Sequence, residues 1–380
     1  MHIRPRLARR LTQLQREQQQ NWLRVRQFVE VWLKNERARR SPTWLAEAAQ
    51  LPFRPHLATL NVTDNCNSRC VTCNVWQERS THELVLEEWK EVLQELHAVG
   101  CSTVILSGGE PLLRKDLEPM IVEAHRLGMH IGLNTNGGLL TERRLKSLLD
   151  AGLGSVSLSM DAVGEAYRQI RGMSFEKVLR AAQLLAEAHR QKQVQVALSC
   201  TLSRLTLPHV WEVLALSRGL GLPLGFNLVD TTPYVFRGVG NETNAWIDGA
   251  ELVQLDHLVE QLLLYKKRAP EALLDSRAAL EYIPRYFRDP LQKALPCTVA
   301  LLRLCIDAHG RVFGGCWSMG SFGSVRDQSL LQIMGSPEYI EKHKQMFRKE
   351  CPGCSCGYKV NLRYSLPSLL STHAGIEASF

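Results

Sequence analysis

One local pattern recurs six times between about residue 55 and residue 230: a short apolar run followed by an amphipathic, helix-like stretch. Strands separated by helices run parallel, because a parallel connection has to cross back over the sheet before the next strand begins. The pattern therefore predicts the α/β class, with a parallel sheet and helices outside it. The expected strands are 57–62, 103–106, 130–133, 155–159, 194–198 and 224–229, and the expected helices are 86–99, 117–127, 142–149, 176–189 and 209–218.

Turn-forming residues follow several of these strands. Ser107-Gly108-Gly109 and Asn136-Gly137-Gly138 come directly after the second and third strands, and Asp230-Thr231-Thr232-Pro233 follows the sixth. In closed or partly closed parallel sheets, functional residues gather where strands end. We therefore expect the site at this edge of the sheet.

The repeat does not reach either end of the chain. The first 50 residues are predicted to be a helical extension with an arginine-rich polar face, and a Leu-rich helix is expected at 250–267. The last 90 residues hold six of the 11 cysteines and are predicted to form a small second domain. The expected division is 1–50 basic helical extension, 51–232 strand–helix domain, 233–290 helical connector and 291–380 cysteine-rich domain.

The net charge of +8 is concentrated in the N-terminal extension. Residues 1–40 contain 11 Lys and Arg against 3 Asp and Glu, so residues 41–380 balance at 35 against 35. A basic arm on a neutral body argues against a protein that coats nucleic acid, but the arm could contact a membrane surface or an acidic partner. No apolar run approaches 20 residues and no apolar signal segment begins the chain, so we expect a cytoplasmic protein without a transmembrane segment.

Three cysteines follow the first expected strand with the spacing C-x3-C-x2-C: Cys66, Cys70 and Cys73. Three thiolates on one loop can hold three irons of a 4Fe–4S cube and leave the fourth iron without a protein ligand. An open coordination position is typical of a catalytic centre rather than a structural one. The alternative is a zinc knuckle, for which only His82 offers a nearby fourth ligand.

This triplet resembles the signature of the radical S-adenosylmethionine (SAM) superfamily, in which the amino and carboxylate groups of SAM bind the open iron. Ser107-Gly108-Gly109-Glu110 resembles the GGE motif of that family, which implies close backbone approach at the glycines and a Glu110 acceptor for the methionine ammonium. Asn134-Thr135-Asn136-Gly137 and Ser159-Met160-Asp161 match further family segments at the ends of the third and fourth strands, and Arg171-Gly172 matches a pair that often follows. The resemblance implies contacts near SAM, to its ribose and to its carboxylate. The implied SAM-binding residues are Ser107, Gly108, Gly109, Glu110, Asn134, Asn136, Ser159, Asp161 and Arg171.

The resemblance also implies the fold and the chemistry. The fold would be a partial (βα)6 barrel with the helical N-terminal extension and the cysteine-rich C-terminal domain. A reduced cluster would give one electron to SAM and form a 5′-deoxyadenosyl radical, which takes hydrogen from the substrate. An electron donor such as flavodoxin or ferredoxin is implied. Thr72 departs from the family pattern, because the family usually has an aromatic residue immediately before the last cysteine of the triplet.

The C-terminal cysteines resemble the SPASM and Twitch extensions of this family, which hold auxiliary iron–sulfur clusters. Residues 297–316 are predicted to be a hairpin that turns at His309-Gly310, with one residue more than the usual four between Gly310 and Cys316. The pattern implies one auxiliary 4Fe–4S cluster rather than two, and a zinc ribbon of the same spacing is the alternative. The implied ligands are Cys297, Cys316, Cys351 and Cys354, either Cys305 or Cys356 being able to replace one of them.

The substrate is left open between a peptide and a small polar molecule such as a sugar or an aminocyclitol. No catalytic residue is assigned, and the candidates for a hydrogen-atom donor are Cys200, Cys305 and Cys356, which an epimerase would need. Cys101 and Cys200 are expected to be packing residues. The competing class is a zinc-dependent nucleic-acid binder, which leaves the strand-end motifs unexplained, and a catalytically dead scaffold is disfavoured by the intact cysteine triplet and Glu110.

Overall fold

The computed structural model describes residues 55, 57–77, 80–229, 245–290, 299, 303–347 and 350. The predicted N-terminal extension, the predicted turn at 230–233, and Cys297, Cys351, Cys354 and Cys356 lie outside the described residues. In the described part, no helix is long and apolar enough to span a membrane.

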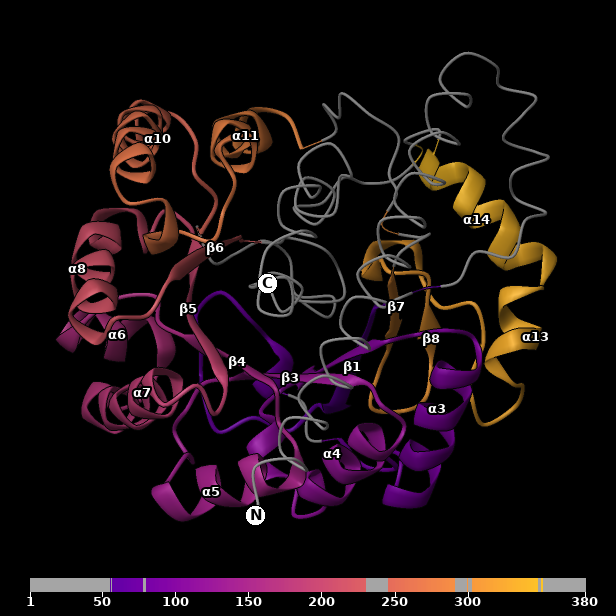
Figure 1. The fold of residues 1–380 in the computed structure, drawn as a ribbon. Coiled ribbons are helices and arrows are strands. Elements are labelled where there is room, and N and C mark those ends of the chain that lie inside the picture. The colour runs from indigo at the N-terminus through magenta and orange to yellow at the C-terminus, as the bar shows by residue number, and fades with distance from the viewer. Residues whose placement is uncertain are drawn as a thin grey trace, which may run out of the picture.

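The centre of the fold is an eight-stranded sheet in the order β6-β5-β4-β3-β2-β1-β7-β8 (Figure 1). The neighbouring pairs from β6 through β1 to β7 are parallel, and β7 and β8 pair antiparallel. The strands are β1 (Leu57–Thr63), β2 (Thr103–Gly108), β3 (His130–Thr135), β4 (Ser155–Ser159), β5 (Gln195–Leu202), β6 (Leu224–Leu228), β7 (Arg303–Ile306) and β8 (Val312–Phe313). All six predicted strands are present, and their order in the sheet follows their order in the sequence.

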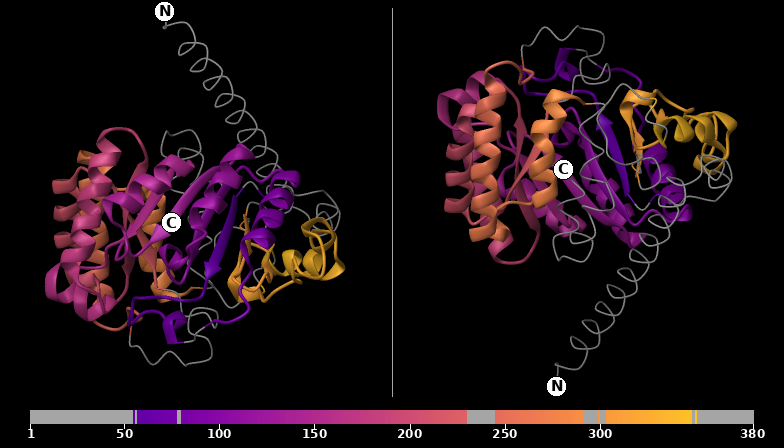
Figure 2. Two further views of the ribbon diagram at one scale, coloured as in Figure 1. Left: turned by 90° about the horizontal axis from the view of Figure 1, so that it is seen from below. Right: turned by 90° about the horizontal axis from the view of Figure 1, so that it is seen from above.

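Helices cover the outer face of the sheet (Figures 1 and 2). The five predicted helices are α3 (Leu86–Ala98), α4 (Leu117–Arg126), α5 (Glu142–Ala151), α7 (Phe175–Arg190) and α8 (Val210–Leu220). A short helix that the sequence did not predict, α6 (Gly164–Arg171), precedes α7. The connector holds α10 (Glu251–Arg268), as expected, and also α11 (Arg277–Arg288).

Side-chain alternation along the strands separates an apolar layer from a polar one. Leu60 and Val62 of β1 and Leu106 of β2 belong to the hydrophobic core shared with the helices. Their neighbours Asn61 and Ser107 are register partners on the opposite face, inside the curve of the sheet. The parallel sheet is thus apolar toward its helices and polar toward its interior.

The predicted hairpin is present, but it extends the barrel sheet instead of standing apart. β7 pairs parallel with β1, so that Thr59 lies opposite Cys305. After β8 the chain forms α13 (Leu330–Met334) and α14 (Pro337–Phe347) on the side of the sheet away from α8 and α10 (Figures 1 and 2). Glu95 of α3 accepts a hydrogen bond from the Leu330 amide, 2.5 Å away. The C-terminal part is therefore docked on the barrel through both the sheet and a helix.

Candidate active site

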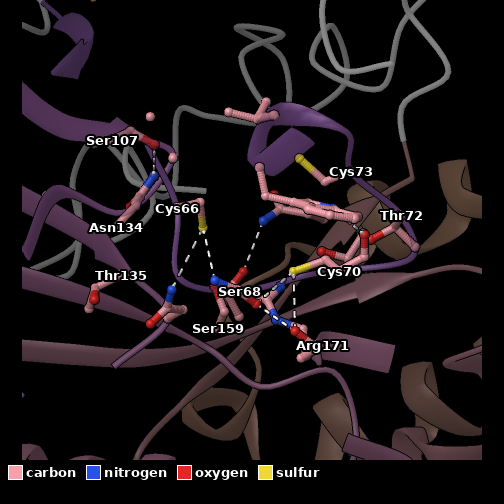
Figure 3. Close-up of a pocket in the computed structure, with 18 of the residues that line it drawn as sticks. Cys66, Ser68, Cys70, Thr72, Cys73, Ser107, Asn134, Thr135, Ser159 and Arg171 are labelled. Atoms are coloured by element: carbon pink, nitrogen blue, oxygen red, sulfur yellow. Dashed lines mark hydrogen bonds between the residues drawn. The ribbon is translucent and has the colours of Figure 1, made fainter. Parts of the chain in front are cut away.

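A cavity of about 300 Å³ opens where the strands end, between them and the cysteine loop (Figure 3). It is lined from the loop by Cys66, Ser68, Cys70, Thr72, Cys73, Val75 and Trp76. From the strand ends and from α6 come Ser107, Gly108, Gly109, Asn134, Thr135, Asn136, Ser157, Ser159, Arg171, Ser199, Thr201, Asn227, Leu228 and Val229. The predicted location of the site is thus the location of this cavity.

The cysteine loop lies between β1 and a short 3-10 helix, Val75–Gln77, and is docked on the end of α6. The Arg69 amide and the Ser68 hydroxyl both donate hydrogen bonds to the Arg171 carbonyl, at 3.1 and 2.6 Å. Gly172 follows in the left-handed conformation with φ 65°, and a Cβ there would lie 2.9 Å from the Arg69 side chain. The Arg171-Gly172 pair therefore ends α6 and provides the surface on which the cysteine loop packs.

The three thiols of the loop face one cavity, and no disulfide links the described cysteines. Burial is the main cause that raises the pKa of Cys66, to about 11. A thiolate at this position therefore needs a cation beside it, and iron supplies one. Over the described residues no group of three side chains is arranged to hold a single metal ion, whereas a cubane binds each thiolate through a different iron.

Gly108 and Gly109 allow the end of β2 to pack against the end of β1. A Cβ on Gly108, where φ is 127°, would lie 2.3 Å from the Thr63 carbonyl oxygen, and a Cβ on Gly109 would lie 2.2 Å from that of Asn65. The Gly109 amide donates to the Thr63 carbonyl at 2.7 Å. Close approach was expected at these glycines. The structure shows that they approach the backbone leading into the cysteine loop.

Glu110 lies behind the cavity wall and not in it, which differs from the expected direct contact. The side chain is fully buried, and its Oε1 accepts from the Leu112 amide at 3.0 Å and from the Thr135 hydroxyl at 2.7 Å. Its Oε2 accepts from the Asn136 amide at 2.7 Å. Burial raises the pKa of Glu110, and these three donors oppose that shift. The carboxylate ties the end of β2 to the end of β3.

Asp161, like Glu110, lies buried below the cavity and does not line it. It is 1% exposed, and its Oδ1 accepts from the Thr201 amide at 2.6 Å. Its Oδ2 accepts from Nη1 of Arg171 at 2.9 Å. Arg171 itself lines the cavity, and its Nε has no hydrogen-bond partner in the described part of the chain. Asp161 thus orients the one cationic side chain of the described lining.

The remaining predicted residues, Ser107, Asn134, Asn136 and Ser159, line the cavity. Within the described structure, the buried Oδ1 of Asn134 has no partner. Four further lining residues were not predicted and continue the polar interior of the barrel: Ser157, Ser199, Thr201 and Asn227. The signal was available, because each of these four polar residues sits at an alternate position of a strand that is otherwise apolar.

The structure also places two of the candidate hydrogen-atom donors. Cys200 is fully buried in the hydrophobic core between Leu198 and Leu202, and so points away from the cavity that Ser199 and Thr201 line. Cys305 is fully buried within β7, opposite Thr59, and does not line the cavity either. Burial raises the pKa of both thiols. Cys200 is therefore not in place to give hydrogen to a substrate radical, whereas Cys305 shares the interior face of the sheet with its register partner Thr59.

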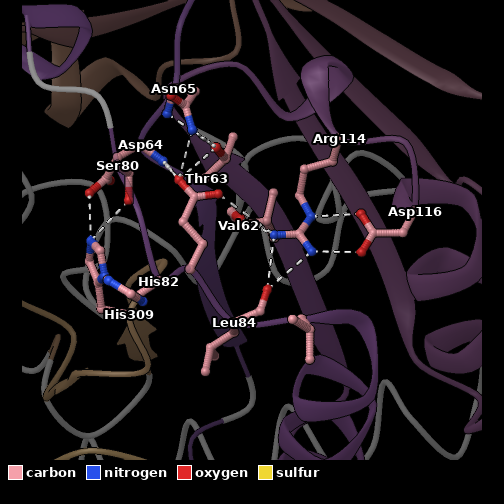
Figure 4. A network of polar contacts seen from close by, with 12 residues as sticks. Val62, Thr63, Asp64, Asn65, Ser80, His82, Leu84, Arg114, Asp116 and His309 are labelled. Carbon is pink, nitrogen blue, oxygen red and sulfur yellow. Dashed lines mark hydrogen bonds and ion pairs between the residues drawn. The ribbon is translucent and has the colours of Figure 1, made fainter.

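A polar network holds the base of the cysteine loop from the other side (Figure 4). Oε1 of Glu83 accepts from the Thr63 hydroxyl and the Asp64 amide, both at 2.9 Å. Arg114 donates to the Val62 carbonyl at 2.8 Å and pairs with Asp116.

The turn of the β7–β8 hairpin reaches this network. Nε2 of His309 lies 3.4 Å from Oδ2 of Asp64 and 3.2 Å from the Ser80 hydroxyl. No local pattern predicted this contact, since Asp64 and His309 are 245 positions apart in the chain.

The barrel is similar in sequence to a known protein family. Residues 60–216 match the family described as the Radical SAM superfamily. The chain is 28% identical over 266 residues to a PqqA peptide cyclase of Bradyrhizobium diazoefficiens, which covers 65% of this chain and 67% of that protein. It is 26% identical over 334 residues to an AdoMet-dependent heme synthase of Methanosarcina barkeri, which covers 79% of this chain and 91% of that protein.

Two solved structures share the fold. SuiB of Streptococcus suis bound to S-adenosylmethionine has a TM-score of 0.62 at 14% identity, over 81% of this chain and 72% of SuiB. The protein anSMEcpe with bound AdoMet and a peptide has a TM-score of 0.59 at 19% identity, over 85% of this chain and 100% of that chain. Both likenesses extend beyond the barrel into the C-terminal part of the chain.

Proposed function

Because the chain belongs to the radical SAM superfamily of enzymes, we propose that it cleaves SAM reductively and uses the resulting 5′-deoxyadenosyl radical to modify a peptide. Its relatives support the SPASM/Twitch-type subgroup. The observation that carries the proposal is the convergence of Cys66, Cys70 and Cys73 with the strand-end motifs on one cavity.

The residues present fit a 4Fe–4S cluster and SAM. Cys66, Cys70 and Cys73 would hold the cluster, since their thiols face the cavity and burial makes a bare thiolate unfavourable at Cys66. Two buried polar atoms at the cavity, Nε of Arg171 and Oδ1 of Asn134, have no partner in the described residues, and a ligand can supply one. Arg171 would pair with the SAM carboxylate. Ser107, Gly108, Gly109, Asn136 and Ser159 would complete the contacts, and Glu110 and Asp161 would position them.

When bound, the cluster and SAM supply one-electron cleavage of the sulfonium and hydrogen-atom abstraction. The protein's own residues orient the reactants and shield the site. The strands line the cavity with hydroxyl and amide groups and carry no acid on the described lining. Arg171, held by its ion pair with Asp161, would offer its remaining N–H donors to an anionic group of SAM. Cys200 is turned into the core, which keeps its S–H bond away from a radical in the cavity. An epimerase that uses Cys200 as hydrogen donor is therefore disfavoured.

A peptide substrate is supported by the relatives. The PqqA peptide cyclases act on a peptide by name, and one matches 80% of this chain at 26% identity. The heme synthase relatives are the observation that favours a second candidate, a porphyrin-like substrate. An electron donor such as flavodoxin or ferredoxin would reduce the cluster, and the basic N-terminal arm would contact an acidic partner or membrane surface.

We place one auxiliary 4Fe–4S cluster on Cys297, Cys316, Cys351 and Cys354. The support within the described residues is at Cys316, which is buried and packs against Val299, two residues after Cys297. Val299, which follows Cys297 closely in the sequence, thus lies beside Cys316. Cys305 lies within β7 and is less suited to be a ligand.

The test is to replace Cys66, Cys70 and Cys73 together by Ala in anaerobically purified protein. The parent should hold about eight irons per chain and the variant about four, because each cubane contains four. The variant should form no 5′-deoxyadenosine from SAM under dithionite. Undiminished SAM cleavage would refute the central proposal, and zinc in place of iron in the parent would favour the zinc-dependent nucleic-acid binder.

A further inference from the structure

The cysteine loop has an exposed side that the SAM site does not use. Burial alternates along the loop from one residue to the next. The buried residues line the cavity: Ser68, Cys70 and Thr72 (Figure 3). The exposed residues do not belong to the cavity lining, and we call them the outer face of the loop: Asn67, Arg69 and Val71. At Cys70 the loop is thus a single layer of chain between the cavity and solvent.

The outer face lies close to the proposed SAM cluster. Arg69 and Val71 are the sequence neighbours of Cys70, so the Cα of each is about 3.8 Å from that of the cluster ligand. The amides of Arg69 and Val71 donate to the carbonyls of Arg171 and Ile170, at 3.1 and 3.0 Å, which fixes the face on the end of α6. Electron transfer between proteins falls steeply with distance. A carrier that touches this face would therefore be well placed to reduce the cluster.

The outer face carries one positive charge that no acid of the described chain neutralises. Arg69 is the only charged residue between Asn65 and Gln77. Within the described residues it makes no ion pair, and its guanidinium carbon lies 6.0 Å from the centroid of the Trp76 ring. Trp76 in turn donates from its indole to the Cys70 carbonyl at 3.3 Å. The cation is therefore held against the loop and is available to an anion from outside.

The surroundings leave this charge as the local attraction for an acidic protein. On the adjoining helix α6, the exposed Arg168 is paired with Glu165 at 2.8 Å. Residues 41–380 hold 35 basic and 35 acidic residues, so the body of the protein exerts no general pull on an acidic partner. Val71 adds an apolar contact beside Arg69, because its side chain is 36% exposed.

We propose that the outer face of the cysteine loop is the docking surface for the electron donor, an acidic one-electron carrier protein whose carboxylates pair with Arg69 around an apolar contact at Val71. The inference rests on the proposed SAM cleavage, which is the reaction that needs the electron. One electron leaves the reduced carrier, which is oxidised, and enters the cluster, which is reduced, and no bond forms or breaks in the transfer. Redox encounters of this kind are small, and a charge at their rim acts on the association rate and its salt dependence.

The experiment uses the full chain and reduced flavodoxin, an acidic carrier, under anaerobic conditions. Arg69→Glu reverses the charge, Arg69→Gln removes it and Arg69→Lys keeps it. Arg218→Glu is the matched control, because Arg218 is an exposed arginine without an ion pair in the described chain. It lies near the end of α8, which leads into the start of β6, and therefore at the end of the barrel away from the cavity.

Three quantities are measured for each protein: the dissociation constant for flavodoxin by titration calorimetry, the iron content, and 5′-deoxyadenosine formation with flavodoxin or with dithionite alone. Arg69→Glu should raise the dissociation constant on the order of tenfold at about 0.1 M salt. The difference from the parent should shrink at about 1 M salt, where the Debye length is about 3 Å. Arg69→Gln should show a smaller rise, and Arg69→Lys and Arg218→Glu should match the parent.

The two reductants separate docking from chemistry. With flavodoxin below its dissociation constant, 5′-deoxyadenosine formation by Arg69→Glu should fall by about the same factor as binding. With dithionite alone it should equal that of the parent, since a small reductant needs no docking surface.

An unchanged dissociation constant in Arg69→Glu, or an equal rise in Arg218→Glu, would overturn the inference. Equal losses of activity with both reductants at full iron content would also overturn it, because Arg69 would then act on the site itself. A parent that binds no flavodoxin but cleaves SAM with dithionite would overturn the inference and leave the proposed function standing, whereas a parent inactive with dithionite would refute the proposed function. If Arg69→Glu loses iron, weaker flavodoxin binding by Arg69→Gln than by Arg69→Lys supports the inference, and equal binding overturns it.

Discussion

Glu110→Gln should destabilise the barrel more than it weakens SAM binding. The carboxylate accepts from three donors, Leu112 N and Thr135 Oγ1 on one oxygen and Asn136 N on the other. A glutamine amide has one oxygen and one –NH2 group, so in either orientation the –NH2 faces a backbone N–H. The substitution therefore leaves a buried donor without an acceptor.

The size of the effect follows from that lost bond. A hydrogen bond to a charged group contributes about 1.5–3 kcal/mol. Removal of the charge relieves part of the cost of burial that raises the pKa of Glu110, but the glutamine –NH2 group still faces a backbone N–H donor in a site with no solvent. We expect the free energy of unfolding to fall by about 1.5–3 kcal/mol, and the melting temperature by about 3–12 °C for a domain of this size.

The assay compares Glu110→Gln with Glu165→Gln. Glu165 lies on α6 in an exposed ion pair with Arg168, so its replacement should change stability little. Melting is followed by circular dichroism under anaerobic conditions, and SAM binding is measured well below the melting temperature. Direct loss of a charged contact to SAM would raise its dissociation constant on the order of tenfold to a hundredfold. A Glu110→Gln protein that melts like the parent and binds SAM that much more weakly would refute the reasoning and restore Glu110 as the ammonium acceptor.

Three other predictions concern the remaining cysteines and the N-terminal arm. Replacement by Ala of any one of Cys297, Cys316, Cys351 and Cys354 should lower the iron content of the auxiliary cluster, while SAM cleavage without substrate persists. Replacement of Cys305 or Cys356 by Ala should leave the iron content unchanged. Iron loss in either of these two variants would mean that the replaced cysteine is a ligand. Cys200→Ala should lower the free energy of unfolding by about 1 kcal/mol, as expected for a small buried side chain, and leave 5′-deoxyadenosine formation unchanged; a collapse of product formation alone would mean that the thiol reaches the cavity. Deletion of residues 1–40 should leave iron content unchanged and abolish salt-dependent association with anionic vesicles or acidic peptides, and equal binding by both chains would make the arm a structural element.

The sequence determined the elements and the motifs because their causes are local. Apolar runs separated by amphipathic stretches specify the strands and helices of the barrel, and every predicted strand was found within a few residues of its expected ends. The placement of the cavity also followed from sequence, because parallel strands bring their ends to one edge. The cysteine triplet and the motifs at the ends of β2, β3 and β4 were readable for the same reason.

Only the tertiary structure decided what each motif residue touches. Glu110 and Asp161 looked like ligand contacts, yet the packing of neighbouring strand ends turned both carboxylates toward backbone amides below the cavity. The hairpin pairs with β1 at the edge of the sheet, since the unpaired backbone N–H and C=O groups of an edge strand can hydrogen-bond to any strand that reaches them. Contacts such as that of Nε2 of His309 with Asp64 depend on how a hairpin turn docks on a loop, and no local pattern in the sequence encodes that distance.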